Sequence, residues 1–194
     1  KIPGIHLKNI FPAMEFLTAS NKKGLGDNVD LFDNGTLNAE GKNIVVIGGG
    51  DTAMDCVRTA VRQNAKSIKC LYRRDKKNMP GSLREVNNAE EEGIQFVWLS
   101  SPKKFLGKDK IENIIIDKIK LGKPDDSGRR IPEVQENSEF MIKADMVIKA
   151  LGFDPENLPK MFNSKDLQIT QRGTLKTDFD TMETNLSGVF AAGD

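Results

Sequence analysis

One stretch decides the fold, because it passes from a strand-like run through three glycines into a helix: Asn43-Ile44-Val45-Val46-Ile47-Gly48-Gly49-Gly50-Asp51-Thr52-Ala53. The β-branched run at 43–47 predicts a buried parallel strand. A helical period follows the glycines, and Asn64 is a plausible C-terminal stop. Residues 67–72 predict a second strand. A strand, a glycine turn, a helix and a strand within about 30 residues predict a right-handed βαβ unit.

The glycine turn matches the dinucleotide fingerprint Gly48-x-Gly50-x-x-Ala53. The first glycine permits a tight turn, the second lets the backbone approach a pyrophosphate, and the small Ala53 lets helix and strand pack closely. The N–H groups at the start of the helix then face the diphosphate. We therefore expect a nucleotide site on residues 48–53, including Gly49, Asp51 and Thr52. A second Gly-x-Gly, at Gly24, has neither a strand before it nor a helical period after it.

The end of the second predicted strand indicates which nucleotide is preferred. An NAD-selective protein places a carboxylate there, whereas this chain has Arg73 and Arg74. Guanidinium groups form charge-assisted hydrogen bonds with a 2′-phosphate, so the pair favours NADPH. The alternative is two solvated arginines in a charged loop.

The rest of the chain predicts an α/β fold with an antiparallel addition. We expect a helix over 82–92 with capping-box spacing at Ser82 and Glu85, stopped at Gly93, and then a strand over 94–99. Strand-like runs at 111–121 and 140–148, joined by a polar connection at 123–138, predict an antiparallel β-meander. Residues 144–150 are expected to rejoin the parallel sheet. A short helix is expected at 13–20.

Composition excludes several classes of function. The 29 Lys and Arg residues nearly balance the 28 Asp and Glu residues, which disfavours nucleic acid or a membrane surface as a partner. Cys56 and Cys70 form no C-x-x-C pair and indicate no metal site, and two unpaired cysteines suit the cytoplasm. His6, the only histidine, lies in an irregular leader, so we assign no catalytic acid or base.

Three motifs carry a resemblance to a known family: Gly48 to Asp55, Tyr72 to Asp75, and Asn78-Met79-Pro80-Gly81-Ser82. In these the chain resembles the small (β) subunits of NADPH-dependent glutamate synthase and related NADPH–flavin oxidoreductase subunits, such as the flavin half of dihydropyrimidine dehydrogenase. The resemblance implies a Rossmann-like NADPH-binding domain over 42–151. It also implies that 1–41 and 152–194 are partial segments of an FAD-binding domain.

The resemblance assigns further cofactor contacts. Ala150-Leu151-Gly152 resembles the return crossing from the NADPH domain to the flavin domain, and Gly193-Asp194 resembles the motif whose Asp hydrogen-bonds the ribityl chain of FAD. The family's own FAD fingerprint and its cysteine-rich iron–sulfur segment have no counterpart here. We therefore expect this chain by itself to be inactive and not to retain FAD.

The function implied is electron transfer. NADPH would pass hydride to FAD, and iron–sulfur clusters would carry electrons to a large subunit for glutamate biosynthesis. The rivals are an NADPH–flavin subunit that reduces pyrimidines or ferredoxin, and a non-catalytic NADPH-binding module. A self-sufficient dehydrogenase is disfavoured, because the only histidine, His6, lies in the irregular leader and offers no histidine-based substrate site.

Overall fold

The structure is a computed structural model that describes residues 2–124 and 128–193. Contacts between Cα atoms divide the chain into two compact units, residues 1–152 and residues 153–194. In the described residues, no helix combines the length and the apolar character needed to cross a membrane.

The centre of the first unit is a five-stranded parallel sheet. Its strands follow the order β1-β9-β2-β3-β4, with bounds β1 (Ile10–Pro12), β9 (Met146–Lys149), β2 (Asn43–Ile47), β3 (Ser67–Leu71) and β4 (Gln95–Val97). Strands β2 and β3 are in register from Asn43 opposite Ser67 to Ile47 opposite Leu71. The predicted βαβ unit and the return of the chain to the parallel sheet near residue 146 are therefore confirmed.

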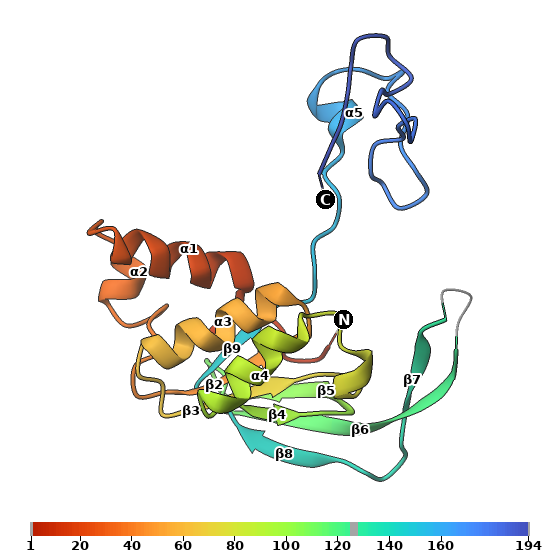
Figure 1. Cartoon of the computed structure of the whole chain (residues 1–194). Coiled ribbons are helices and arrows are strands. Elements are labelled where there is room, and N and C mark those ends of the chain that lie inside the picture. Colours follow the sequence, from red (N-terminus) through yellow and green to blue (C-terminus); the bar gives the residue numbers. More distant parts are fainter. Residues whose placement is uncertain (1, 125–127, 194) are drawn as a thin grey trace. The chain divides into compact units, whose positions relative to one another are not determined.

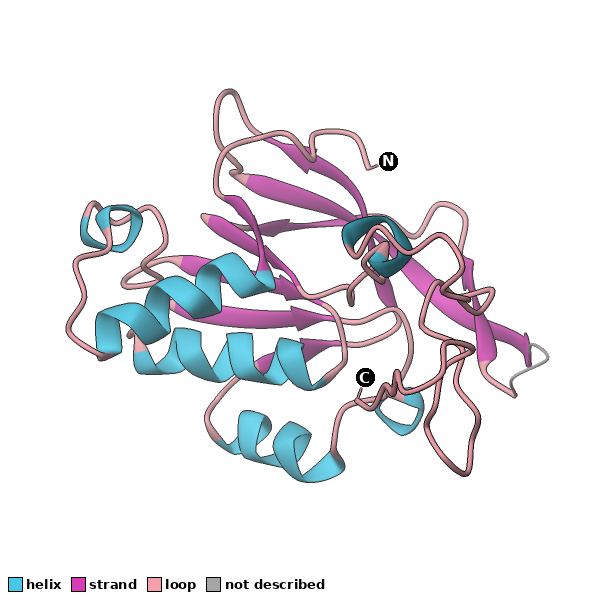
Figure 2. Ribbon diagram, turned by 90° about the horizontal axis from the view of Figure 1, so that it is seen from above, coloured by secondary structure: helices cyan, strands magenta, loops and turns pink. Residues whose placement is uncertain are grey.

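Three helices cover one face of this sheet: α1 (Ala13–Gly24), α3 (Asp51–Arg62) and α4 (Leu83–Glu91). They lie next to one another in Figures 1 and 2. Phe16, Val57 and Val86, one from each helix, are fully buried in one core cluster that also contains Ile44 and Val46 of β2. Two short elements, α2 (Asp30–Asp33) and η1 (Lys76–Asn78), complete this side.

A second, antiparallel sheet covers the opposite face. It contains β5 (Ser100–Leu106), β6 (Asn113–Pro124), β7 (Arg130–Val134) and β8 (Phe140–Lys143), with β5, β7 and β8 all paired to β6. Because side chains alternate along a strand, Val45 and Ile47 of β2 point away from the helices and pack with Phe105 and Ile114 in a second core. The unit thus has three layers, and the α/β class with an added meander is confirmed.

Several local predictions were incomplete or wrong. Ser82 precedes α4, but its side chain makes no capping hydrogen bond, and Glu85 pairs with Arg58 of α3 instead. The expected capping box is therefore not formed. Strand β5 was not predicted, and β7 lies inside the stretch that we interpreted as a connection. Strand β7 is mostly exposed, so it lacks the apolar alternation by which strands are recognised.

The flanking segments differ in how they pack. Strand β1 pairs with β9, and Phe16 of α1 is fully buried, so residues 1–41 contribute to the first unit. The observed division falls between residues 152 and 153, and the expected domain boundaries stay a prediction. The assignment of residues 1–41 to a flavin domain stays a proposal.

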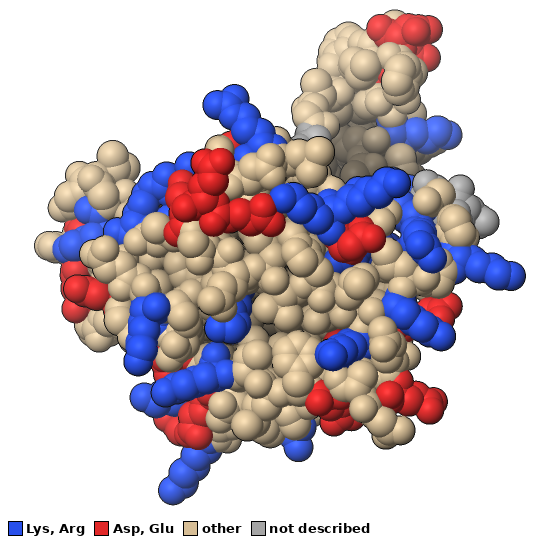
Figure 3. Space-filling model, turned by 60° about the horizontal axis from the view of Figure 1, so that its bottom comes forward, with Lys and Arg blue, Asp and Glu red and all other residues tan. Residues whose placement is uncertain are grey.

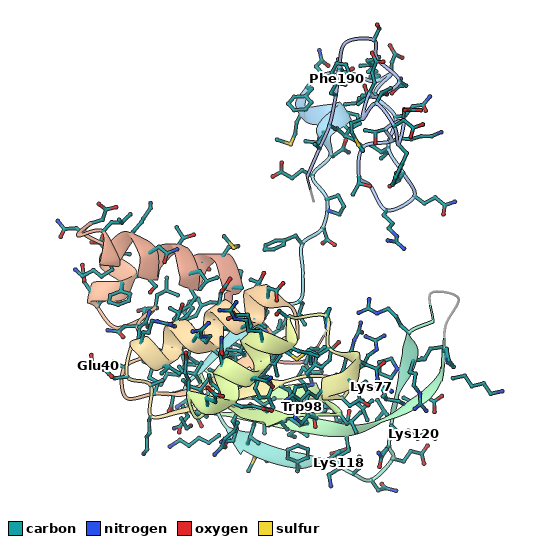
Figure 4. The ribbon with its side chains drawn as sticks, in the orientation of Figure 1. Glu40, Lys77, Trp98, Lys118, Lys120 and Phe190 are labelled. Carbon is teal, nitrogen blue, oxygen red and sulfur yellow. The ribbon has the colours of Figure 1, made fainter. Side chains whose placement is uncertain are left out.

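The second unit contains little regular structure. Its helix α5 (Leu158–Met161) is short, and isolated bridges join Thr177 to Thr184 and Glu183 to Phe190. Phe190, labelled in Figure 4, keeps 62% of its surface exposed.

Candidate nucleotide-binding site

The glycine turn joins β2 to α3, and its three glycines are needed for different reasons. A Cβ on Gly48 would lie 2.1 Å from the carbonyl oxygen of Ala150, and a Cβ on Gly49 would lie 2.4 Å from the ring of Tyr72. Either would force a shift of the structure. A Cβ on Gly50 would meet nothing within 4 Å. Gly48 and Gly49 therefore serve packing, whereas the space beside Gly50 is open to a ligand.

The start of α3 offers backbone donors at this turn. The carbonyl of Gly50 accepts from the N–H groups of Ala53 and Met54. Within the described residues, the N–H groups of Gly50, Asp51 and Thr52 have no protein acceptor. Unpaired N–H groups at a helix N-terminus are suited to binding a phosphate.

A neighbouring loop is fixed to the turn. The Asp51 carboxylate accepts from the backbone N–H of Ser82 at 3.0 Å, and the Gly81 N–H donates to the Gly49 carbonyl at 2.9 Å. The carboxylate of Asp51 thus holds the loop of residues 80–82.

The turn forms one wall of a cavity of about 530 Å³. The cavity brings together most of the predicted site residues, which come from the carboxyl ends of β2, β3 and β9: Gly48, Gly49, Gly50, Thr52, Arg73, Arg74, Ala150 and Gly152. Asp51 and Ala53 do not line it, and Ala53 is fully buried beneath the turn. Gly193 belongs to the second unit. Asp194 lies outside the described residues.

The two arginines after β3 have different environments. Arg73 is exposed, whereas Arg74 keeps only 6% of its surface exposed. The Nε of Arg74 donates to the carbonyl of Arg130 at 2.9 Å. Within the described residues, its two Nη groups have no hydrogen-bond acceptor, and no acidic residue lines the cavity. A guanidinium that lines a cavity without acidic residues in its described lining suits an anionic ligand, because it can donate charge-assisted hydrogen bonds to that ligand.

Sequence reasoning missed the part of the cavity that the antiparallel sheet supplies. Ser100 and Ser101 line it from β5, and Arg129 lines it from the residue before β7. The Gly128-Arg129-Arg130 triplet was the available signal, since it repeats the pairing of arginines seen after β3.

An aromatic cluster supports the floor near β3. The ring of Tyr72 lies against Gly49 and meets the ring of Trp98 edge-on, with the ring centroids 6.4 Å apart. The ring of Trp98 stacks on that of Phe96, with the centroids 4.6 Å apart. Trp98 is labelled in Figure 4. These contacts fix the ring that requires a glycine at position 49.

The cysteines are buried, as the sequence predicted, and burial raises the pKa of both thiols to about 12. The Sγ of Cys70 lies 3.4 Å from the carbonyl of Gly48. An iron–sulfur cluster is typically held by four cysteine thiolates, so Cys56 and Cys70 alone do not supply the ligands of one. Among the described residues, no group of three His, Cys, Asp or Glu side chains is placed to hold a metal.

Comparison with known proteins identifies the family. The model of the pyridine nucleotide-disulphide oxidoreductase family matches residues 2–194. The chain belongs to this family. The name of the family describes oxidoreductases that use a pyridine nucleotide.

Relatives at higher identity narrow the comparison. The chain is 57% identical to the glutamate synthase [NADPH] small chain of Azospirillum brasilense over all of this chain and 40% of that protein. It is 40% identical to the protein of the same name from Escherichia coli, over 95% of this chain and 40% of that protein. This chain thus spans less than half the length of these relatives. The predicted resemblance to the small-subunit family is confirmed.

Solved structures support the fold. Thioredoxin reductase of T. acidophilum matches with a TM-score of 0.66 at 16% identity, over all of this chain and 54% of that one. FprA of Mycobacterium tuberculosis in complex with NADPH matches with a TM-score of 0.64 at 18% identity, over 82% of this chain and 48% of that one. At such identities the likeness concerns the fold alone.

Proposed function

We propose that this chain is the NADPH-binding region of an NADPH-dependent glutamate synthase small chain. The observation that carries the proposal is that one cavity contains two kinds of group that bind phosphate. Open backbone donors lie beside Gly50, and Arg74, which keeps 6% of its surface exposed, lines the cavity at the end of β3. NADPH has a phosphate for each, a pyrophosphate and a 2′-phosphate, whereas NADH has only the first.

The chain's contribution to the reaction is to bind and orient the nucleotide. When both cofactors are bound, NADPH supplies a hydride and the flavin accepts it, and the cofactors carry that chemistry. The residues of the glycine turn hold the diphosphate, and the arginines hold the adenine ribose end. Such positioning sets the rate of hydride transfer without a side-chain acid or base.

The further course of the electrons rests on resemblance. In the proposed whole protein, FAD contacts Asp194, iron–sulfur clusters held by other cysteines accept the electrons, and a large subunit uses them for glutamate synthesis in the cytoplasm. The runner-up is a different NADPH–flavin subunit. The beta subunit of an NADP(+)-dependent formate dehydrogenase from Moorella thermoacetica is 38% identical over 80% of this chain. The 57% identity over the whole chain favours glutamate synthase.

Calorimetric titration of the 194-residue chain with NADPH and with NADH tests the proposed site. We expect NADPH to bind about ten- to a hundredfold more tightly, because a hydrogen bond to a charged group contributes roughly 1.5–3 kcal/mol. Equal affinities for the two nucleotides would refute the assignment of the arginines.

A further inference from the structure

The β6–β7 hairpin contributes a wall to the nucleotide cavity. Arg129 lines the cavity from the residue before β7, while Arg73 and Arg74 line it from the end of β3. The hairpin is part of the antiparallel sheet, which lies on the other face of the parallel sheet from the helices. The antiparallel sheet and the glycine turn thus line the same cavity.

Two arginines hold the base of the hairpin in place. The Nε of Arg74 donates to the Arg130 carbonyl at 2.9 Å, which ties β7 to the end of β3. The guanidinium of Arg130 donates from Nε to the Gly122 carbonyl at 3.0 Å and from Nη2 to the Leu121 carbonyl at 2.6 Å. The Arg130 side chain therefore bonds within the hairpin, and the neighbouring Arg129 lines the cavity.

The cavity concentrates positive charge in a way that the surface does not. The face in Figure 3 mixes Lys and Arg side chains with Asp and Glu side chains, and the whole chain carries a formal charge of only +1. Among the described residues, the cavity wall has three arginines and no acidic side chain. Such a wall is suited to a doubly charged phosphate monoester, because a guanidinium group can donate two parallel hydrogen bonds to phosphate oxygens.

We propose that Arg129 is a specificity-determining residue that binds the 2′-phosphate of NADPH together with Arg73. Arg74 holds the hairpin through its Nε, and its guanidinium adds positive charge to the same wall of the cavity. This inference rests on the proposed function, since it assigns a partner to one phosphate of the nucleotide proposed there. It adds to the site a residue of the β6–β7 hairpin, Arg129, which lies more than fifty positions along the chain from Arg73.

The test uses the 194-residue chain with Arg129→Gln, Arg73→Gln and the double variant. Calorimetry measures the dissociation constants of NADPH and NADH, and adenosine 2′,5′-bisphosphate is titrated against 5′-AMP to isolate the 2′-phosphate. We expect Arg129→Gln to weaken NADPH and the bisphosphate about tenfold, and to leave NADH and 5′-AMP within about twofold. The double variant is expected to depart from the product of the single effects, because both side chains share one phosphate.

Arg62→Gln is the matched control. Arg62 is an exposed arginine in the last turn of α3, roughly 16 Å from the start of that helix at 1.5 Å per residue. The Arg62→Gln substitution is expected to leave the affinities for NADPH and NADH unchanged. NADH binding of each variant serves as the check that the site has folded.

The outcomes separate this inference from the proposed function. A parent chain that prefers NADPH, with the preference intact in Arg129→Gln, would overturn the role of the hairpin and leave the proposed function standing. An equal loss of NADPH and NADH would also overturn it, because a 2′-phosphate ligand acts on one nucleotide alone. A parent chain that binds neither nucleotide would overturn both.

Discussion

The two ends of the cavity are built from different materials. The end beside Gly50 is made of backbone, with three consecutive glycines and the first N–H groups of α3. The end beside Arg74 is made of side chains from strands that lie far apart in the sequence, with Arg73 and Arg74 after β3 and Arg129 before β7.

This difference divides the work of recognition. Backbone donors at a helix start bind a pyrophosphate, which NADH and NADPH share. Guanidinium groups bind the phosphate monoester that only NADPH carries. The backbone end should therefore set the affinity for any dinucleotide, and the arginine end should set the choice between two of them.

The largest effect is expected from Gly50→Val. A Cβ at this position enters open space, and the φ of −92° and ψ of 179° suit valine. The fold should therefore survive, with a thermal midpoint within about 5 °C of the parent. The branched side chain occupies the space that the pyrophosphate needs, so NADPH and NADH should both weaken more than about a hundredfold, by loss of two or more charged hydrogen bonds. Calorimetry and thermal unfolding measure the two results.

Gly24→Val is the control for this variant. Gly24 ends α1, has open space around it, and belongs to the second Gly-x-Gly of the sequence. Nucleotide binding should be unchanged. Selective loss of NADPH in Gly50→Val would contradict the division between the two ends.

The same division explains what the sequence predicted. Every part of the backbone end is consecutive, so the strand, the turn and the start of α3 were placed correctly from residues 43–53. The end of α3 was also placed correctly, since Asn64 adopts a φ of 58° just beyond it. Local chemistry determines these features, because a glycine turn between a buried strand and an amphipathic helix has few alternatives.

The arginine end depends on tertiary packing, which local patterns do not encode. Nothing in the sequence around Arg74 indicates that its side chain is buried and bonded to the Arg130 carbonyl. Strand β7 is mostly exposed and has no apolar alternation, so its pairing with β6 was not predicted. The capping box at Ser82 failed for a similar reason, because Glu85 is drawn to Arg58 on the neighbouring helix.

A smaller and selective effect is expected from Arg74→Met, which keeps the length of an unbranched chain and removes the charge. NADPH should weaken about ten- to a hundredfold, by roughly 1.5–3 kcal/mol, and NADH should change much less. Arg74→Lys should recover part of the loss, because it restores the charge without the planar fork. Titration of both nucleotides at low and high salt gives a second measure, since the NADPH preference should shrink with screening. A fall in NADH affinity as large as that of NADPH would place Arg74 outside the selective end.

The smallest effect on nucleotide binding is expected from treatment of the two thiols with an alkylating reagent. Cys70 lies under the backbone end, with its Sγ 3.4 Å from the Gly48 carbonyl, and desolvation raises its pKa from 9.0 to about 12. At pH 8 the thiolate fraction is then roughly a thousandfold lower than in the unfolded chain, since each unit of pKa is a factor of ten. Iodoacetamide should leave the native chain unmodified and its nucleotide binding intact, while the chain in denaturant should react at both cysteines, as mass spectrometry can measure.

The same shift fixes the direction of the pH dependence of stability. The folded thiol holds its proton between pH 9.0 and about 12, whereas the unfolded thiol has lost it. The unfolded state therefore binds fewer protons in this window, so the free energy of unfolding should fall as the pH rises through it. Below pH 9.0 both states are protonated and the contribution of Cys70 is constant. Urea titrations at pH 8 and pH 10 measure this difference, and Cys70→Ala, which has no proton to lose, should reduce it.

Rapid alkylation of native Cys70 at pH 8, with loss of NADH binding, would instead mean that the backbone end contains a reactive side chain, and the contrast between the two ends would not hold.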